Sequence, residues 1–230
     1  MKPRIHSLLS ADPDELRRWL TEPGVRGAVW CGLTAFLGAG VYGFTIGLWR
    51  APLQAIYTGI KFPLLVALTG TGNALLNGML AQVFGSGISF RQTALAILMS
   101  FAITGLILGA LAPVSLFILY NTPALASGAM LLGHSVTLIT HVVFIAGAGM
   151  IANGRLFRLL KSISPNEIIA RRVLGGWLAG NLLLGSQLAW VLRPFIGSPG
   201  LRIEFLRPDP LRGNFYEAVG HALRHLFFSA

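Results

Sequence analysis

The chain has 230 residues, of which 54% are hydrophobic and only 11% are charged, and its formal net charge is +10. A typical soluble domain carries about 25% charged residues, so this composition excludes an ordinary soluble protein. In a soluble chain the excess of Lys and Arg would suggest nucleic-acid binding. Here the basic residues lie between long apolar stretches, where they bind lipid headgroups and set orientation. We therefore expect no nucleic-acid partner.

Five apolar runs without Asp, Glu, Lys or Arg fill most of the chain. About 20 apolar residues are needed for a helix to cross the bilayer core, and each run meets or approaches that length. The sequence predicts an all-α, polytopic transmembrane helix bundle of about five spans, with short amphipathic helices at both termini. One membrane domain at 27–192 then lies between an N-terminal segment, 1–26, and a C-terminal loop with an interfacial helix, 193–230. The runs are 27–49, 62–84, 92–112, 129–152 and 173–192.

Basic residues between the runs predict the orientation. The segment 1–26 and the loop 153–172 are rich in Lys and Arg, whereas the loop before 62 holds only Arg50 and Lys61, and 120–129 holds none. The positive-inside rule places the N-terminus in the cytoplasm, and five spans then place the C-terminus outside. Five arginines in the tail argue against an outside location under the same rule. A tail that folds back into the membrane would place the C-terminus in the cytoplasm instead.

Several local signals mark helix ends. Asp12, followed by Pro13 and two acids, starts a short N-terminal helix. A capping box from Ser164 to Glu167 starts the fifth helix, and Asn214 starts the C-terminal one. Pro113 is predicted to end or kink the third span.

Small residues recur at four-residue spacing in four of the runs. Lipid tails are as apolar as Leu, so helices associate in a bilayer through close backbone contact, which small residues permit. This spacing predicts tightly packed helices, although glycine is also simply common in membrane helices. The predicted packing residues are Ala35, Ala39, Gly43, Gly47, Gly70, Ala74, Gly78, Gly105, Gly109, Gly176 and Gly180.

Neutral polar residues lie inside the spans. For the two histidines three interpretations stay open: hydrogen bonds between helices, the lining of a polar cavity or proton path, and binding of a metal or haem. One metal cannot take two ligands that lie two helical turns apart. For the amide side chains, interhelical hydrogen bonds are the simplest interpretation. The set comprises Asn73, Asn77, His134, His141, Asn181 and Gln187.

Catalytic and cofactor motifs are missing from the sequence. GTGNAL at 70–75 and GAGMIA at 147–152 approximate a dinucleotide fingerprint, but both lie in apolar spans rather than between a strand and a soluble helix. Cys31 is the single cysteine, which excludes an intrachain disulfide. We therefore expect no cofactor, no metal site and no catalytic residues, and a non-enzymatic protein.

The segment GSQLAWVLRPFIGSPGL, continued by FLRPDPLRGNFYEAV, resembles part of a family of bacterial multi-pass proteins with about five spans. WRAPLQAIYTGIKFPLL resembles the first loop and second span of that family. The architecture is also loosely similar to that of the five-span Yip1-type proteins. The resemblance implies a bacterial inner-membrane location, and it carries no activity and no functional residues.

The Pro-rich stretch after the fifth run is predicted to fold over the end of the bundle. Arg193 can cap the last carbonyls of the helix, and the glycines and prolines that follow turn the chain. Two interpretations remain open, a docking surface or lid and a structural plug. The residues of this docking loop are Arg193, Pro194, Gly197 and Pro199.

These features favour an accessory, assembly or scaffold subunit that works through helix packing. The expected partners are the lipid bilayer, with anionic lipids at the basic loops, and other membrane proteins or a second copy of the chain. The alternative is a small transporter or channel whose neutral polar path is lined by Asn and His side chains. That alternative requires these side chains to converge on one cavity.

Overall fold

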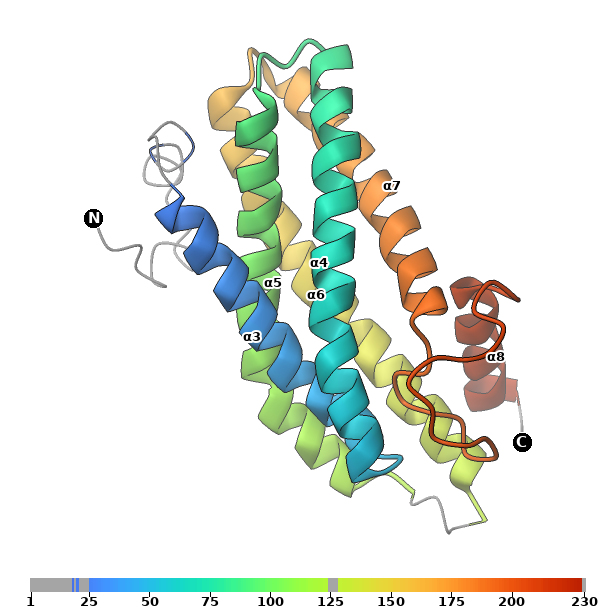
Figure 1. Ribbon diagram of the computed structural model, residues 1–230. Helices are drawn as coiled ribbons and strands as arrows, with labels where there is room; N and C mark the ends of the chain where they lie inside the picture. Colours follow the sequence, from blue (N-terminus) through green and yellow to red (C-terminus); the bar gives the residue numbers. More distant parts are fainter. Residues whose placement is uncertain (1–17, 19, 21–24, 124–127, 229–230) are drawn as a thin grey trace.

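A computed structural model describes residues 18, 20, 25–123 and 128–228, and within them the chain is all-helical, with no strand. The helix expected from Asp12 lies outside the described residues. Six helices follow one another along the chain (Figure 1). They are α3 (Arg26–Leu48), α4 (Pro52–Val83), α5 (Phe90–Tyr120), α6 (Met130–Ile163), α7 (Glu167–Val191) and α8 (Phe215–Phe228).

Side-chain caps fix the starts of three helices. At α5 the Ser89 hydroxyl accepts from the Gln92 N–H, and the Gln92 side chain accepts from the Ser89 N–H, which forms a capping box. The α8 helix begins as predicted, with the Asn214 side chain accepting from the Glu217 N–H at 3.0 Å. At α7 the prediction was wrong by two residues, because Asn166 rather than Ser164 is the cap.

Three helices are longer than the apolar runs indicate. The α4 helix begins at Pro52, where the missing N–H costs nothing because the first helical turn has no acceptor for it. The α5 helix continues through Pro113 to Tyr120, so of the two predicted outcomes, an end or a kink, the structure excludes the end. Membrane helices tolerate an internal proline when their neighbours satisfy the freed backbone groups. The α6 helix extends to Ile163 and carries three basic residues beyond its apolar run.

Four of the described helices, α3 to α6, are long and apolar enough to cross a membrane. The α7 helix is not among them, because Asn181, Ser186 and Gln187 interrupt its apolar stretch. The expected fifth span is therefore not confirmed.

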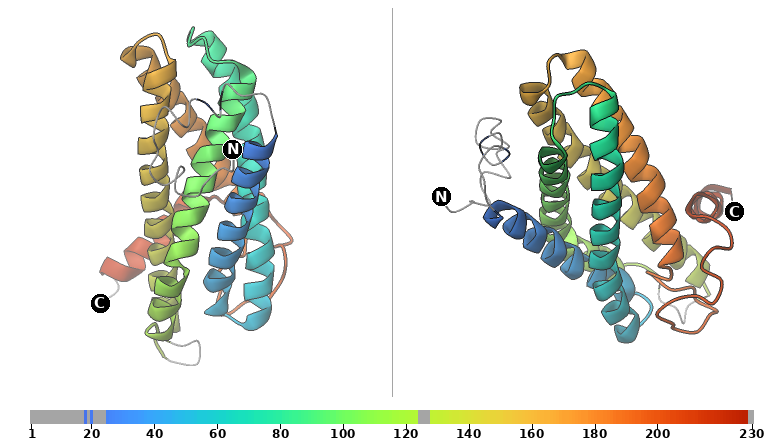
Figure 2. Two further views of the ribbon diagram at one scale, coloured as in Figure 1. Left: turned by 90° about the vertical axis from the view of Figure 1, so that its left-hand side faces the viewer. Right: turned by 45° about the horizontal axis from the view of Figure 1, so that its top comes forward.

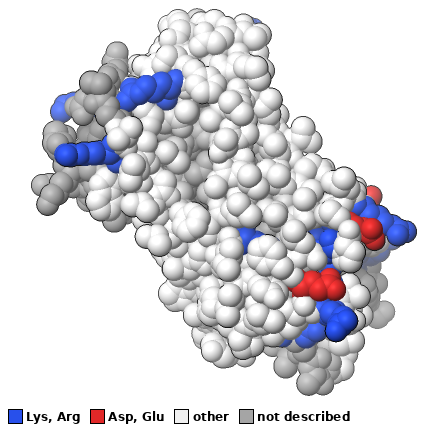
Figure 3. All heavy atoms as spheres, viewed as in Figure 1, with Lys and Arg blue, Asp and Glu red and all other residues white. Residues whose placement is uncertain are grey.

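Consecutive helices from α3 to α7 run in alternating directions (Figures 1 and 2). The turns 84–89 and 164–166 therefore lie at one end of the bundle, and the turn 49–51 and the tail lie at the other. The side chain of Arg91 donates to the Leu20 carbonyl, which places the start of the described chain at the first end. In the view of Figure 3 the charged side chains gather at the upper left, beside the start of the described chain, and at the lower right, around the tail, and few lie on the face between them.

The buried core divides along the length of the bundle. One cluster joins α3, α5, α6 and α7 around side chains such as Cys31, Leu160 and Trp177. The second surrounds Tyr42 and Trp49, and it includes Ile196 from the segment after α7. The C-terminal tail is thus part of the packed core at one end of the bundle.

Candidate functional site

The α3 helix approaches the backbone of α4 closely at two glycines. A Cβ atom on Gly43 would lie 2.8 Å from the Thr58 carbonyl oxygen, and one on Gly47 would lie 2.5 Å from the Gln54 carbonyl oxygen. Real Cβ atoms do not approach backbone this closely, so both positions require glycine. Ala39, on the same ladder of small residues, is 1% exposed.

The α3 helix meets α5 through a glycine that the sequence pattern missed. A Cβ on Gly38 would lie 2.1 Å from the Gly105 carbonyl oxygen, and one on Gly105 would lie 2.9 Å from the Cα of Ala35. One turn further along α5, a Cβ on Gly109 would lie 3.4 Å from the Cα of Gly38. Gly38 lies outside the four-residue ladder, and its pairing with Gly105 emerges only when both helices are placed.

The remaining small residues contact side chains rather than backbone. Gly70 and Gly78 lie against the rings of Phe101 and Phe90 from α5, and Gly176 of α7 lies against the Phe84 ring. Ala74 is partly buried and packs against the core.

Asparagines connect α4 to α7. The Asn73 amide donates to the Asn181 side-chain oxygen at 2.8 Å, and the Asn77 amide donates to the Asn73 oxygen at 3.5 Å. The indole of Trp177 donates to the Asn77 carbonyl at 3.3 Å. Gly180 leaves room for these amides, since a Cβ there would lie 3.4 Å from both amide oxygens. Gln187, by contrast, is exposed and takes no part.

The histidines of α6 face α3. His141 is buried, and its Nδ1 lies 2.7 Å from the Tyr42 hydroxyl. The ring of His134 lies 5.8 Å from that of Trp49, whose indole donates to the Pro123 carbonyl. The histidines therefore belong to the α3–α6 interface and the asparagines to the α4–α7 interface, and no single polar surface is formed by both sets.

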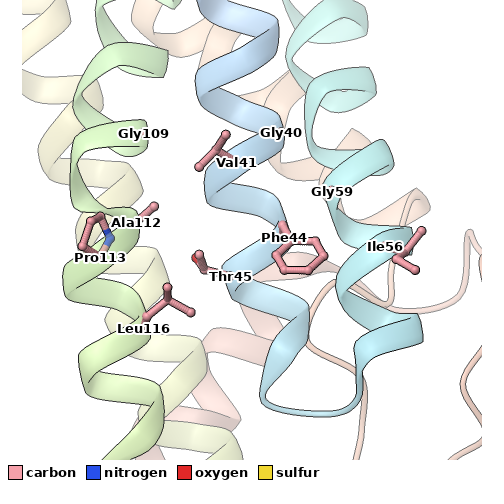
Figure 4. Close-up of a pocket in the computed structure, with 10 residues that line it drawn as sticks. All are labelled: Gly40, Val41, Phe44, Thr45, Ile56, Gly59, Gly109, Ala112, Pro113 and Leu116. Carbon is pink, nitrogen blue, oxygen red and sulfur yellow. The ribbon is translucent and has the colours of Figure 1, made fainter.

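Two hollows open on the α3–α4–α5 side of the bundle. The larger, of about 670 Å³, is lined by apolar and small residues (Figure 4). Its one polar side chain, Thr45, is already bonded to the Tyr42 carbonyl and to the Ser115 hydroxyl. The second hollow, of about 360 Å³, opens where α3 diverges from α4 and is also apolar. Neither hollow is lined by the asparagines or histidines of the spans.

The polar contacts are densest beneath the C-terminal tail, where three side chains of α4 bind backbone carbonyls of the tail. The Gln54 amide donates to the carbonyls of Pro194 and Phe195 at 2.9 and 3.0 Å. The Thr58 hydroxyl donates to the Phe195 carbonyl. The Lys61 ammonium donates to the carbonyls of Pro194 and Phe205, the latter at 2.8 Å. We call these three side chains of α4 the tail clamp.

Lys61 is fully buried, which is rare for lysine. In the described part of the chain no carboxylate pairs with it, and its charge is compensated by the carbonyl oxygens and by two aromatic rings. Its Nζ lies 5.3 Å from the centre of the Phe195 ring and 5.4 Å from that of Phe205. A desolvated cation–π contact contributes on the order of 2 kcal/mol, which offsets part of the large cost of burying a charge.

The tail clamp corrects the interpretation of Lys61 as a residue of the first loop. The hydropathy pattern places it outside the second span, whereas it lies inside α4, about two and a half turns from the start at Pro52. A signal was nevertheless present in the sequence. Gln54, Thr58 and Lys61 are spaced four and three residues apart, which puts them on one face of a helix.

Arg193 fixes the other side of the tail. Its guanidinium donates to the carbonyls of Trp190, Asp209, Pro210 and Arg212, and it lies 3.9 Å from the centre of the Trp190 ring. The contact with the Trp190 carbonyl is the predicted helix cap. Beyond it, the Arg193–Pro194 peptide bond is cis, and Pro194 is buried.

Glycines let the tail approach its neighbours. Gly197 has a φ of +87°, and a Cβ there would lie 3.0 Å from the side chain of Arg50. Gly213 has a φ of +77° and lies beneath the Trp190 ring, whose indole donates to the Arg212 carbonyl. Pro199 is only partly buried. The tail is therefore a folded, irregular segment with its own tertiary contacts.

Comparisons with protein-family models, with curated proteins and with solved structures found no match to this chain.

Proposed function

We propose that this chain is a non-enzymatic integral membrane protein that acts as an accessory, assembly or scaffold subunit, with its C-terminal tail as the docking surface. Its partner is another membrane protein or a second copy of the chain, and its basic ends contact anionic lipids. The observation that carries the proposal is the tail clamp. A buried lysine that binds only tail backbone and rings is a costly way to hold a loop, and it gives the loop one fixed shape.

The shape and charge of the tail support this role. Arg202, Leu206 and Leu211 are exposed on it, close to the Arg207–Glu204 ion pair. A fixed surface that mixes charged and apolar side chains offers a partner defined contacts without the entropy cost of ordering a loop on binding.

The polar groups of the bundle support packing rather than transport. Asn73 bonds to Asn181 between α4 and α7, and His141 bonds to Tyr42 between α3 and α6. These bonds join helices at two separate interfaces, and the side chains do not converge as a polar path would require.

The proposal extends to placement in the cell. We propose a bacterial inner membrane, with the N-terminus in the cytoplasm and the tail in the periplasm. The helices α3 to α7 alternate in direction and are odd in number. The tail therefore emerges at the end of the bundle opposite to the start of α3. An alkaline phosphatase reporter fused after residue 230 is expected to be active, and one fused after residue 86 inactive; the opposite pattern contradicts this orientation.

The functional proposal is tested by purification from native membranes in mild detergent. We expect the protein to elute as a defined complex larger than its 24.6 kDa chain with bound detergent. The variant Lys61→Met should lose the complex, while Lys161→Met, at the opposite end of the bundle, should keep it. A lone monomer that copurifies with nothing contradicts the proposal.

A further inference from the structure

Two arginines beside the tail carry buried N–H groups that meet no acceptor in the described residues. These are Nε of Arg50 and Nη2 of Arg207. Another nitrogen of each side chain is engaged, since Nη2 of Arg50 donates to the Leu201 carbonyl at 3.1 Å and Nη1 of Arg207 donates to the Arg202 carbonyl at 3.2 Å. Because Leu201 and Arg202 are adjacent, both guanidinium groups approach the same turn of the tail.

An unpaired buried donor is costly, which indicates that an acceptor belongs here. The penalty is about 1–3 kcal/mol for a neutral group and more for a charged one. Both donors belong to arginines that approach one turn of the tail, whereas the other unpaired side-chain atoms of the described residues are spread over α4, α5, α6 and the turn after α6.

The surrounding charge favours an anionic acceptor. The positive charge of Arg207 acts on both Lys61 and Arg193. The pKa of Arg193 is lowered by desolvation and by Arg207, and it is raised in part by Asp209. Four cations, including Arg50, therefore surround this end of the tail, and the carboxylates near them are Glu204, paired with Arg207, and Asp209.

We propose that Arg50 and Arg207 bind a phosphate group beside the tail turn 201–207. The planar guanidinium fork matches phosphate geometry and remains charged at any physiological pH. Arg50 lies in the turn between α3 and α4, next to Trp49, and such helix ends lie at the level of lipid headgroups. The phosphate is therefore that of an anionic phospholipid or a free phosphate ion, and the site needs no protein partner.

The test uses the full-length purified protein in neutral detergent and has two arms. In the first, inorganic phosphate is titrated, and its effect on the thermal unfolding midpoint is followed. In the second, native mass spectrometry measures the retention of dioleoylphosphatidylglycerol, which is anionic, against dioleoylphosphatidylcholine, whose zwitterionic headgroup has no net charge. The variants are Arg50→Gln and Arg207→Gln, and the control is Arg172→Gln, an exposed arginine at the opposite end.

We expect phosphate, phosphatidylglycerol or both to bind the wild-type protein. Each Gln variant should bind at least tenfold more weakly, because one charge-assisted hydrogen bond contributes about that factor or more. Arg172→Gln should bind as the wild type does. An effect of phosphatidylglycerol alone identifies the lipid as the source, and an effect of both ligands identifies the phosphate group itself.

Two results would overturn the proposal. One is that neither ligand binds the wild-type protein, in which case water satisfies the buried N–H groups. The other is an equal loss in Arg172→Gln, which would indicate binding by nonspecific surface charge.

Because the Gln variants also lose hydrogen bonds to the tail, Arg50→Lys and Arg207→Lys are tested beside them. These keep the charge, and with an intact tail they should bind with intermediate affinity; a complete absence of binding contradicts the proposed site.

Discussion

Two faces of α4 are joined to their surroundings by different means. Along its first turns α4 meets α3 through glycines, with backbone against backbone and no polar side chain between them. On another face of the same turns the tail clamp binds the tail through hydrogen bonds and a buried cation. Further along, asparagines bind α7. Helices that are adjacent in sequence thus associate by shape, whereas the later elements α7 and the tail are fixed by polar groups.

This difference indicates which contacts select their partner segment. Close packing of small residues tolerates many apolar neighbours, whereas Lys61 fits only a segment that supplies carbonyls and rings in the right places. The glycine contacts therefore determine the stability of the bundle, and the tail clamp determines which segment covers its end.

The largest effect is expected from Gly38→Ala. The added Cβ would meet the Gly105 carbonyl oxygen at 2.1 Å and would force α3 and α5 apart. We expect a loss of about 3 kcal/mol in the free energy of unfolding, the upper part of the range for overpacking. Thermal unfolding in mild detergent measures it. The matched control is Gly32→Ala on the same helix, where nothing lies within 4 Å, and stability there should stay the same or rise. Equal losses in both variants would disprove the role of the α3–α5 contact.

Lys61→Met should release the tail without unfolding the bundle. The substitution leaves the carbonyls of Pro194 and Phe205 without this donor, at a cost of about 2 kcal/mol. It also removes a buried charge, so the global unfolding midpoint should change little. Limited trypsin digestion, read by mass spectrometry, should show cleavage after Arg202 and Arg212, both exposed on the tail, that is at least tenfold faster. Lys161→Met serves as the control, and unchanged cleavage in Lys61→Met would refute the clamp.

A smaller effect is expected at the asparagine contact. Asn181→Ala removes the partner of Asn73, which is 1% exposed. Hydrogen bonds between membrane helices contribute about 0.6 kcal/mol on average, so the loss of stability should be near that value. Gln187→Ala on the same helix should cost nothing measurable. A loss of several kcal/mol at Asn181 would show that this interface, rather than the glycine contacts, dominates the bundle.

The smallest effect should come from Glu167→Gln and should depend on pH. Hydrogen bonds from Lys161 and Arg171 lower the pKa of this exposed carboxyl. A lowered pKa in the folded state adds stability above the pKa of the unfolded chain, and that stability is lost as the pH falls through the folded pKa. The wild-type protein should therefore melt slightly above Glu167→Gln at pH 7, and the difference should shrink as the pH falls below the ordinary pKa of a glutamate carboxyl. A difference that grows on acidification would contradict this sign.

Much of the helical architecture could be predicted from the sequence, because hydropathy and capping are local properties. The all-helical fold was predicted correctly, and so was the start of α8 at Asn214. The start of α4 was missed because Lys61 interrupts the apolar run, and its burial depends on carbonyls that lie 133 residues later in the chain.

The candidate site was predictable only in part. Pro194 and Gly197 follow from the turn-forming composition of the tail, and Arg193 follows from its position at the helix end. Its partners on α4 do not, because a polar face on a helix looks the same whether it faces water or a returning tail. Gly38 was overlooked for a similar reason, since its contact with Gly105 depends on the crossing of two helices.

The most direct test of the tail as a docking surface is photocrosslinking in native membranes from a reactive residue at position 211, where Leu211 is 82% exposed. A matched probe replaces Met150, which is 72% exposed on the apolar surface of α6. We predict a discrete protein adduct from position 211 that disappears in Lys61→Met, and none from position 150. An adduct that persists in Lys61→Met, or no protein adduct from position 211, would contradict the account.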